Sequence, residues 1–419
     1  MYRIAIRIYV LLALFAGSFV YAADWGGFRG ADRLGISREN NLLEQWPPGG
    51  PKELWTVQGL GIGYSSAAIA NGMVYTTGLD PVSKEGFLFA FDLQGKPKWK
   101  KSYGPEWKGS FKGARTTPTI ENDRVYVISG YAVVKCFDAK TGDQKWSYDA
   151  GSEFKTKKLT WGISESVLIY KDNVICCPCG DDASVIALDK MTGKLAWVCK
   201  DAIQTAGYCS PIVIRHGNRD IIVNMMQSNL VGIDANTGKL LWQSKVPEPD
   251  AGFGADNNPV CPVYKDGFLY STSGYGKGGV MYKIAPDGNS ISKVWEDKTL
   301  DVHHGGVVLI DGYIYGASWD GNSKGSWVCL DFKTGKVMYD EKWLGYKGSI
   351  IAAGEMLYCW EETKGNIALV KANPKKFQIV STFRVEKGDK EYWAHPSISD
   401  GVLYLRHGDV MMAYDIKKK

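Results

Sequence analysis

Hydrophobic and polar residues alternate along most of the chain in short runs separated by glycine-containing turns. One kind of run ends in Asp, passes through a polar Thr-Gly turn and resumes until a large aromatic residue, as in residues 233–242, IDANTGKLLW. This pattern predicts two strands joined by a tight hairpin. A second kind alternates after an Asn-Gly or Asp-Gly pair, as in Asn71-Gly-Met-Val-Tyr75. Such pairs favour hairpin turns, because both turn residues adopt positive φ.

Both kinds of run recur with a period of 44 to 53 residues. The period is measured between the closing aromatic residues, which are Trp55, Trp99, Trp146, Trp197, Trp242, Trp295, Tyr339 and Phe383. Each period holds about four short strands and almost no helical periodicity, which is the signature of a propeller blade. The strand before each Asp is continuously apolar, as in residues 185–188, and this is typical of a strand packed between neighbouring blades.

Counting the periods predicts the architecture. Seven complete blades are expected at approximately 65–100, 116–149, 164–200, 208–245, 257–297, 303–342 and 347–385. An eighth begins at Ala394 and ends at Asp415 without its last strand, and residues 51–57, PKELWTV, have the shape of that strand. We therefore predict an all-β chain, an eight-bladed β-propeller of four-stranded antiparallel blades whose ring is closed by an N-terminal strand, which removes free sheet edges. The alternative is seven blades and a loose tail.

The first residues are typical of a secretory signal. Arg3 and Arg7 precede an apolar run, and small residues follow at Ala22 and Ala23. The chain is thus divided into a signal peptide (1–23), an N-terminal extension (24–50) and the propeller (51–419), and a periplasmic or secreted location is expected. The alternative is an uncleaved anchor, although the apolar core is short for a membrane span. No cysteine stands at the cleavage site, which argues against a lipid anchor, and no transmembrane segment is expected after cleavage.

Composition narrows the range of partners. The net charge of +5 is small for 419 residues, so nothing indicates nucleic acid or an anionic membrane surface. The 9 cysteines all follow the signal segment, and their odd number requires at least one free thiol or an intermolecular bond. Most lie in apolar strand-like runs and are expected to be small buried hydrophobic residues. We expect a monomer.

The repeated Asp-x-x-Thr-Gly-Lys-x-x-Trp phrase resembles the repeat of pyrroloquinoline-quinone (PQQ) type propellers, which include quinoprotein alcohol dehydrogenases and the outer-membrane assembly propeller BamB. The resemblance covers the chain from about Trp55 onward. The opening Asp24-Trp-Gly-Gly-Phe-Arg-Gly30 resembles a subgroup of exported PQQ-like repeat proteins whose role is largely unassigned. The phrase identifies the blade type and not an activity. Its residues are expected to be structural: Gly permits the turn, Trp docks between adjacent blades, and Asp binds turn amides.

Candidate site residues stand where each blade begins, because propeller ligands usually contact the loops and inner-strand starts around the central channel. Polar and aromatic side chains are concentrated at these positions. The predicted ligand-binding residues of the channel face are Tyr64, Arg115, Trp161, Glu165, Tyr208, Asp256, Asn257, His303, His304, Lys347, Trp393 and His395.

These residue types suit several ligands. Arg115 and Lys347 would hold carboxylates, and the aromatic residues would stack on a flat ring or a sugar. The carboxylate, amide and imidazole groups would bind a cation or move protons. The alternative is a wet, polar channel mouth whose side chains satisfy one another.

The resemblance to quinoprotein dehydrogenases implies further groups at the site. The resemblance implies a calcium site of carboxylate and amide ligands, an Asp base, a Trp platform under the quinone and a disulfide between adjacent cysteines. Glu165 and Asn257-Asn258 are the candidate calcium ligands, and Cys176-Cys177-Pro-Cys179 offers adjacent cysteines. Within a strand, Cys176 and Cys177 point to opposite faces. A Cys176–Cys177 bridge, and a Cys176–Cys179 bridge or metal site, are both alternatives.

Three functions follow from this combination. The first is an exported propeller that binds a small molecule, a carbohydrate or a protein partner at the channel face, without proven catalysis. The second is a PQQ- and calcium-dependent alcohol or sugar dehydrogenase, and the third is a BamB-like scaffold for envelope proteins. The catalytic residues, the metal and the substrate are not identified by the sequence, and fold alone does not select among these functions.

Overall fold

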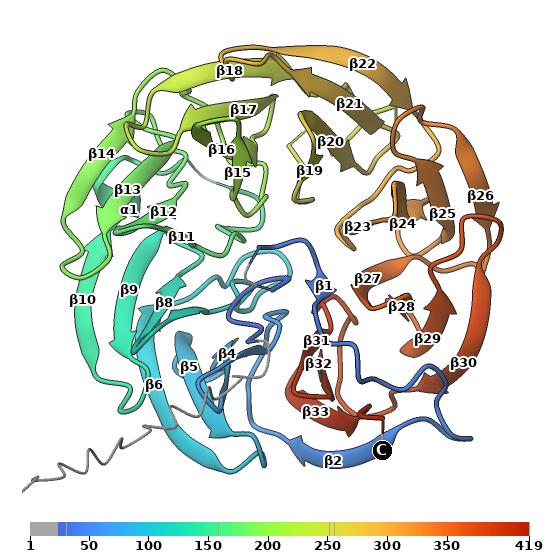
Figure 1. Ribbon diagram of the computed structural model, residues 1–419. Coiled ribbons are helices and arrows are strands. Elements are labelled where there is room, and N and C mark those ends of the chain that lie inside the picture. Colours follow the sequence, from blue (N-terminus) through green and yellow to red (C-terminus); the bar gives the residue numbers. More distant parts are fainter. Residues whose placement is uncertain (1–23, 31, 158, 251, 255, 419) are drawn as a thin grey trace, which may run out of the picture.

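Eight β-sheets stand in a ring around a central axis in the computed structural model (Figure 1). The structure describes residues 24–30, 32–157, 159–250, 252–254 and 256–418. The predicted signal peptide, residues 1–23, lies outside the described residues. The prediction of an eight-bladed, all-β propeller is confirmed, and the alternative of seven blades and a loose tail is wrong.

The first four blades follow the chain in order, from the innermost to the outermost strand. Blade one contains β3 (Ala68–Ala70), β4 (Met73–Leu79), β5 (Glu85–Asp92) and β6 (Pro97–Pro105). Blade two contains β7 (Thr119–Glu121), β8 (Arg124–Ile128), β9 (Val133–Asp138) and β10 (Gln144–Asp149). Blade three contains β11 (Leu168–Tyr170), β12 (Asn173–Cys176), β13 (Val185–Asp189) and β14 (Leu195–Cys199). Blade four contains β15 (Ile212–His216), β16 (Arg219–Met225), β17 (Asn229–Asp234) and β18 (Leu240–Lys245).

The remaining blades repeat this order, with strands from the N-terminal segment added to the last two. Blade five contains β19 (Val263–Lys265), β20 (Phe268–Ser273), β21 (Gly278–Ile284) and β22 (Ile291–Asp297). Blade six contains β23 (Val307–Ile310), β24 (Tyr313–Trp319), β25 (Gly325–Asp331) and β26 (Val337–Glu341). Blade seven contains β27 (Gly348–Ala353), β28 (Met356–Glu361), β29 (Asn366–Lys371), β30 (Gln378–Arg384) and the short β1 (Ile36–Ser37). Blade eight contains β31 (Ser397–Ser399), β32 (Val402–His407), β33 (Val410–Asp415) and β2 (Lys52–Val57).

This antiparallel order gives the ring two different faces. We call turn face the side with the hairpins between first and second and between third and fourth strands, such as Asn71-Gly72. We call mouth face the side with the hairpins between second and third strands and the loops between blades, such as residues 106–118. Asn71 and Gly72 have φ of 54° and 73°, as the hairpin prediction requires. The Thr-Gly turns of the repeat therefore lie on the turn face, away from the predicted site.

Adjacent blades are joined by a repeated contact between an outer-strand Trp and the Thr-Gly turn of the next blade. The Trp99 indole N–H donates to the Ala139 carbonyl at 3.2 Å. A Cβ on Gly142 would lie 2.7 Å from the Trp99 ring, so only glycine fits there. Equivalent contacts join the pairs Trp55–Gly95, Trp146–Gly193, Trp197–Gly238 and Trp295–Gly335. The structural roles predicted for Trp and Gly are confirmed.

The Asp of the repeat organises the same turn. Asp138 Oδ1 accepts hydrogen bonds from the backbone N–H groups of Lys140 and Thr141, both at 3.0 Å. Asp189, Asp234 and Asp331 accept from the equivalent turn amides. The prediction that Asp binds turn amides is therefore confirmed, and each turn is fixed in the shape that receives the neighbouring Trp.

The ring closes as predicted, through β2. This strand pairs antiparallel with β33, and Trp55 lies opposite Ala413. The Trp55 indole N–H donates to the Leu93 carbonyl of blade one at 2.8 Å, and its ring packs against Gly95. The first strand of the propeller thus completes the last blade and clamps it to blade one.

The N-terminal segment begins at the turn face, where Asp24 accepts from the Asn71 backbone, and continues near the axis of the ring (Figure 1). We call residues 24–30 and 32–37 the channel plug. Trp25 is 2% exposed and bridges Ile69 of β3, while the Gly26 carbonyl accepts from the Ile120 N–H at 2.8 Å. The plug ends in β1, which runs parallel to β27. The chain then returns along blade eight, where the Leu43 N–H donates to the Ile416 carbonyl at 2.8 Å.

Helix is almost absent from the described ranges. The only α-helix assigned there is α1 (Ala150–Glu153), one turn long, which Asp149 caps by accepting from the Ser152 N–H. No helix in those ranges is long and apolar enough to cross a membrane.

We predict that Trp55→Ala lowers the free energy of unfolding by about 2–4 kcal/mol, because the last blade loses its apolar anchor on blade one. Urea denaturation measures this loss. Val82→Ala, at a side chain that is 88% exposed, is the control and changes the stability by no more than about 0.5 kcal/mol. Equal stabilities for the two variants would contradict a closing role for Trp55.

Candidate functional site

The channel plug contains two buried arginines. Their guanidinium groups donate hydrogen bonds to backbone carbonyls at the inner strands of the ring. Arg29 donates to the carbonyls of Val307 and Ile350 and to His395 Nδ1 at 3.1 Å. Arg33 donates to the carbonyls of Pro211, at 2.8 Å, and Val167. These bonds connect blades three, four, six, seven and eight to one segment, so the plug fills the channel beneath the predicted site.

Burial and charge shift the acid–base properties around the plug. Burial lowers the pKa of Arg29 to about 10. The pKa of the buried Cys261 thiol falls to about 7, chiefly because Cys209 forms a hydrogen bond with it and also because Arg33 and Arg29 place positive charge nearby. The plug therefore brings its own positive charge into the middle of the ring.

His395 belongs to the plug contacts rather than to an open surface. Its Nε2 lies 2.9 Å from the His304 carbonyl, which only accepts, so Nε2 carries the proton and Nδ1 accepts from Arg29. The ring is 4% exposed, and burial lowers its pKa to about 3. The structure thus places this predicted ligand-binding residue in an internal contact, as a neutral imidazole.

Above the plug, aromatic side chains gather at the channel mouth. Trp393 packs against Tyr64, Phe111 and His304 with ring centroids 5.0, 5.1 and 5.3 Å apart. His304 contacts His303 at 4.4 Å, and the contacts continue from His303 to Tyr275 and on to Trp319. We call the mouth cluster the residues Tyr64, Phe111, Tyr275, His303, His304, Trp319 and Trp393.

A hydrogen-bond chain holds the His303 ring in place. The Asn257 side-chain amide donates to the Tyr275 hydroxyl at 3.0 Å, and that hydroxyl lies 2.8 Å from His303 Nε2. The Tyr275 hydroxyl and His303 Nε2 share one hydrogen bond, whose direction is set by the tautomer of the imidazole. Burial lowers the pKa of His303 to about 3, which keeps it neutral at physiological pH.

Three ring nitrogens of the mouth cluster have no hydrogen-bond partner in the described part of the chain: His303 Nδ1, His304 Nε2 and Trp319 Nε1. All three atoms are buried. The rings of His303 and Trp319 contact Tyr275, with centroids 5.0 and 5.3 Å from it. Buried polar groups are almost always paired in folded proteins, so the mouth cluster is a part of the predicted site whose polar groups remain unsatisfied.

Lys347 lies in an ion pair that the sequence did not predict. Its ammonium contacts Glu362 Oε1, and the His304 Nε2 lies 3.3 Å from Glu362 Oε2 without a hydrogen bond. Both charged side chains are buried, with 2% and 4% exposed. Burial raises the pKa of Glu362 to about 7 and lowers that of Lys347. Lys347 is therefore already paired, and the charge it was expected to offer a carboxylate is neutralised by Glu362.

Arg115 borders the mouth cluster but its donors are used locally. It donates to the carbonyls of Ser110, Phe111 and Gly113 in its own loop, and its guanidinium lies 5.6 Å from the centre of the Tyr64 ring. The Tyr64 hydroxyl donates to Glu391 at 3.2 Å. Arg115 thus shapes the loop that carries Phe111.

Trp161, Tyr208 and Glu165 form a separate group near blades three and four. The rings of Trp161 and Tyr208 lie 5.4 Å apart, and burial, with a smaller contribution from the charge of Asp256, raises the pKa of Tyr208 to about 12. Glu165 Oε1 accepts from the Cys177 N–H at 2.6 Å, and burial raises its pKa to about 7. The cavity bordered by Glu165, Cys177 and Tyr208 has a volume of about 10 Å³, room for about one water.

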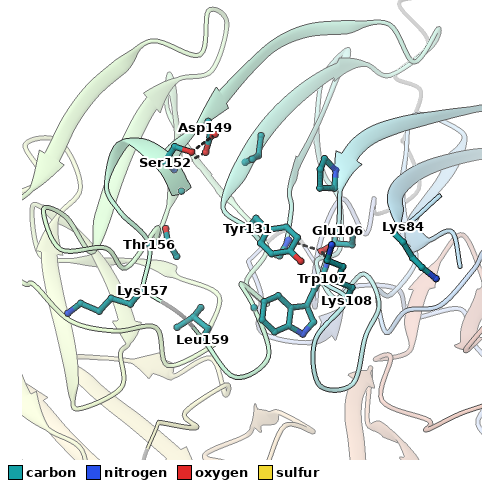
Figure 2. A pocket seen from close by; sticks show the side chains of 15 residues that line it. Lys84, Glu106, Trp107, Lys108, Tyr131, Asp149, Ser152, Thr156, Lys157 and Leu159 are labelled. Carbon is teal, nitrogen blue, oxygen red and sulfur yellow. Dashed lines mark hydrogen bonds between the residues drawn. The ribbon is translucent and has the colours of Figure 1, made fainter. Parts of the chain in front are cut away.

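A larger hollow lies off the axis on the mouth face. Its volume is about 560 Å³, within the range of small-molecule sites (Figure 2). Trp107, Tyr131, Asp149 and Thr156 are among its lining residues, together with lysines from three loops. None of the predicted site residues lines it.

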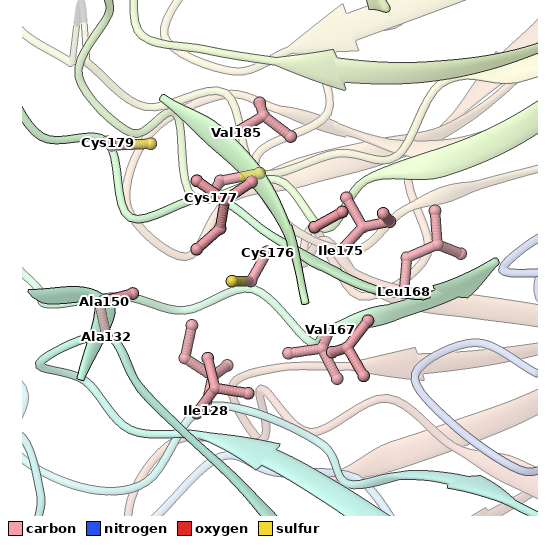
Figure 3. Close-up of a cluster of buried hydrophobic side chains, with 14 of the residues drawn as sticks. Ile128, Ala132, Ala150, Val167, Leu168, Ile175, Cys176, Cys177, Cys179 and Val185 are labelled. Atoms are coloured by element: carbon pink, nitrogen blue, oxygen red, sulfur yellow. The ribbon is translucent and has the colours of Figure 1, made fainter. Parts of the chain in front are cut away.

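All nine cysteines, each in the described part of the chain, are buried free thiols. The prediction of small buried hydrophobic residues is confirmed for burial. Figure 3 shows the sulfur atoms of Cys176, the last residue of β12, and of Cys177, the residue after it, on different sides of the chain. Cys177 Sγ accepts from the Asn224 amide at 3.1 Å.

The residues proposed for PQQ and calcium do not fit those groups. The roughly 10 Å³ beside Glu165 is far below the ~300 Å³ that small-molecule pockets usually need. The Asn258 amide oxygen accepts from the Lys277 ammonium at 2.8 Å, so a cationic side chain already occupies the oxygen expected to bind calcium. In the described ranges, no three His, Cys, Asp or Glu side chains gather as metal ligands.

Sequence reasoning missed several residues that define the site. Tyr275, Trp319 and Glu362 lie at or just beyond the ends of second strands, whereas the predicted site residues stand where each blade begins. Arg29 and Arg33 lie in the extension, which was assigned no place in the ring. The Gly-rich Trp25-Gly-Gly-Phe-Arg29 stretch is the signal that could have identified them, because a backbone that passes close to other buried backbone needs glycine.

Comparison with known proteins gives a consistent family. A family model described as outer membrane protein assembly factor BamB matches residues 84–341. BamB of Moranella endobia is 23% identical over 66% of this chain and 69% of its own length. The quinoprotein ethanol dehydrogenase of Pseudomonas aeruginosa is 27% identical over 37% of this chain, and the match spans only 26% of that enzyme.

Solved structures of both kinds share the fold. The quinohemoprotein alcohol dehydrogenase from Comamonas testosteroni superimposes with a TM-score of 0.68 and 12% identity, covering 95% of this chain and 81% of that one. BamB from Moraxella catarrhalis gives 0.62 and 14% identity, covering 87% of this chain and 99% of that one. At these identities the likeness establishes the fold alone.

We predict that Glu165→Gln reduces the pH dependence of stability. The pKa of Glu165 is raised from 4.5 to about 7 in the folded protein, so the native state binds the extra proton between these values. Stability then falls as the pH rises through this window, by about 1–3 kcal/mol. The variant keeps an acceptor for Cys177, and its stability falls by correspondingly less in urea titrations at pH 4.5–7.5. The slope that remains comes from other carboxyl groups whose pKa burial raises, such as Glu362. Glu248→Gln, at a side chain that is 71% exposed, is the matched control, and an unchanged slope in Glu165→Gln would contradict the assignment.

Proposed function

The chain belongs to the family of PQQ-repeat propellers whose model is described as outer membrane protein assembly factor BamB, and we propose that it is a non-catalytic binding protein of the cell envelope. Its mouth face docks an extended segment of a protein partner. The observation that carries this proposal is the aromatic mouth cluster, in which Trp393 packs against Phe111 and the Phe111 side chain is 48% exposed. An aromatic surface of this kind suits the apolar side chains of an extended segment.

Exposed apolar side chains on the same face support a protein partner. Large apolar residues on the mouth-face loops and turns are exposed to between 41% and 88%: Val82, Phe111, Ile203, Phe253 and Leu344. They come from turns and loops of different blades. Exposed apolar surface rimmed by polar residues is typical of protein interaction sites. An aromatic mouth with apolar side chains around it matches the composition of interface cores.

The filled channel favours a partner that binds on the surface of the mouth face over a quinone that binds inside the ring. Arg29 and Arg33 fill the ring beneath the mouth cluster, and the space beside Glu165 holds about one water. A surface ligand contacts the mouth without entering the ring. A periplasmic or secreted location belongs to this proposal, because the predicted signal peptide would export the chain.

Site-specific photo-crosslinking in the cell that makes the protein tests the docking face. A benzophenone amino acid at Phe111, which is 48% exposed on the mouth face, is expected to give a discrete protein adduct. The same amino acid at Met191, which is 52% exposed on the turn face, is the matched control and gives none.

A second substitution connects the adduct to the mouth cluster. Trp319→Ala is expected to lower the adduct yield from position 111 about fivefold, the effect of ~1 kcal/mol of lost aromatic contact. Adducts of equal yield at positions 111 and 191, or no adduct at position 111, would overturn the proposal.

We predict that the purified protein shows no saturable binding of PQQ in the micromolar range, with or without calcium, because the ring offers no space for the quinone beside Glu165. Fluorescence titration and a dye-linked alcohol oxidation assay measure this. Saturable binding accompanied by alcohol oxidation would establish a dehydrogenase and refute a non-catalytic function.

A further inference from the structure

A pocket of about 560 Å³ lies on the mouth face between the loops of blades one, two and three (Figure 2). Its lining comes from the end of β6, the hairpin between β8 and β9, and α1 with the loop that follows it. It shares no residue with the mouth cluster. A hollow of this size accommodates a small organic molecule.

The pocket has an aromatic wall that is held rigidly. The rings of Trp107 and Tyr131 lie 5.7 Å apart at 49°, and Figure 2 shows them across the cavity from Thr156 and Leu159. A Cβ on Gly162 would lie 2.7 Å from the Trp107 ring, so glycine backbone backs that ring closely. The Trp107 indole N–H donates to the Ser110 carbonyl at 3.0 Å. Because its indole N–H is already hydrogen-bonded, Trp107 presents only the apolar part of its ring to the pocket.

The charge around the pocket is positive. Lys84, Lys108 and Lys157 line it. Lys157 makes only a surface ion pair of 3.9 Å with Asp181, which is weak. The Glu106 carboxyl group is buried rather than presented to the pocket: it accepts from the Tyr103 hydroxyl and the Gly130 N–H, and burial raises its pKa.

Polar acceptors complete the lining. Asp149 is exposed at the rim, where it caps α1 by accepting from the Ser152 N–H and hydroxyl at 2.9 and 2.7 Å. A carboxylate has about four acceptor positions, so it can accept from a further hydroxyl. The pocket therefore combines an aromatic wall, ammonium donors and a carboxylate acceptor.

We propose that this pocket binds an acidic sugar unit, a pyranose ring carrying a carboxylate. The apolar face of the ring lies on Trp107, its carboxylate pairs with the lysines, and its hydroxyl groups donate to Asp149. An aromatic carboxylic acid would use the wall and the lysines but has no hydroxyl to give Asp149. The ligand belongs to a different class from the partner of the mouth face, and the two sites are independent.

Isothermal titration with trigalacturonate tests the proposal. Saturable binding is expected, weakened about tenfold by Trp107→Ala, a loss of ~1.4 kcal/mol of ring contact. Lys108→Glu, at an exposed position, is expected to weaken binding to a similar degree and to reduce its salt dependence. Met191→Ala, at a side chain that is 52% exposed on the turn face, is the control and leaves the affinity unchanged.

Competing ligands define the chemical class. Maltotriose, which is neutral, is expected to bind at least about tenfold more weakly, because it lacks the carboxylate that pairs with the lysines. Benzoate is expected to displace trigalacturonate only at concentrations at least about tenfold higher. If Trp107→Ala fails to fold, Lys108→Glu decides the result, since a change at an exposed lysine preserves the fold.

The proposal is overturned if trigalacturonate shows no saturable binding up to millimolar concentration, if maltotriose binds equally well, or if neither variant changes the affinity. Equal displacement by benzoate would assign the pocket to aromatic acids instead. None of these results changes the crosslinks from position 111, so failure here is distinguishable from failure of the proposed function.

Discussion

The contact between an outer-strand Trp and the Thr-Gly turn of the next blade is the interaction on which the ring depends. Each such turn is shaped by an Asp that accepts from its amides, as Asp138 does, and is kept free of a Cβ by glycine, as at Gly142. The indole then has one place to lie, which fixes the distance and angle between neighbouring blades. Because the first of these tryptophans, Trp55, belongs to the last blade, the same contact also joins the ring's two ends.

A ring built in this way leaves a central channel lined by backbone carbonyls that need hydrogen-bond donors. The channel plug supplies those donors. Inner-strand carbonyls such as Val167 and Ile350 face the axis, where buried acceptors require partners. Arg29 and Arg33 supply them with charged donors, which form stronger hydrogen bonds than neutral ones. The cost is that the middle of the ring is occupied. Chemistry that needs a deep pocket is displaced to the mouth face, where the aromatic side chains gather.

The repeat predicted the fold because its signal was periodic and local. Turn residues and the closing Trp mark every blade, so blade number, strand order and the role of Trp55 followed from the sequence. The site was predicted only in part. Tyr64, His303, His304 and Trp393 do meet at the mouth, because equivalent blade positions converge on one axis.

Contacts between distant, non-equivalent segments could not be predicted from a repeat. His395 contacts Arg29 across most of the chain. Tyr275 and Trp319 lie at or just beyond the far ends of second strands, after the repeated Asp-Gly run that opens them. The turn face, in contrast, holds both described ends: Asp24 accepts from the Asn71 backbone, and the Ile416 N–H donates to the Gly401 carbonyl. Any tether joined at either end, whether to a lipid bilayer or to a biosensor chip, would therefore present the aromatic mouth outward, unobstructed by its own attachment.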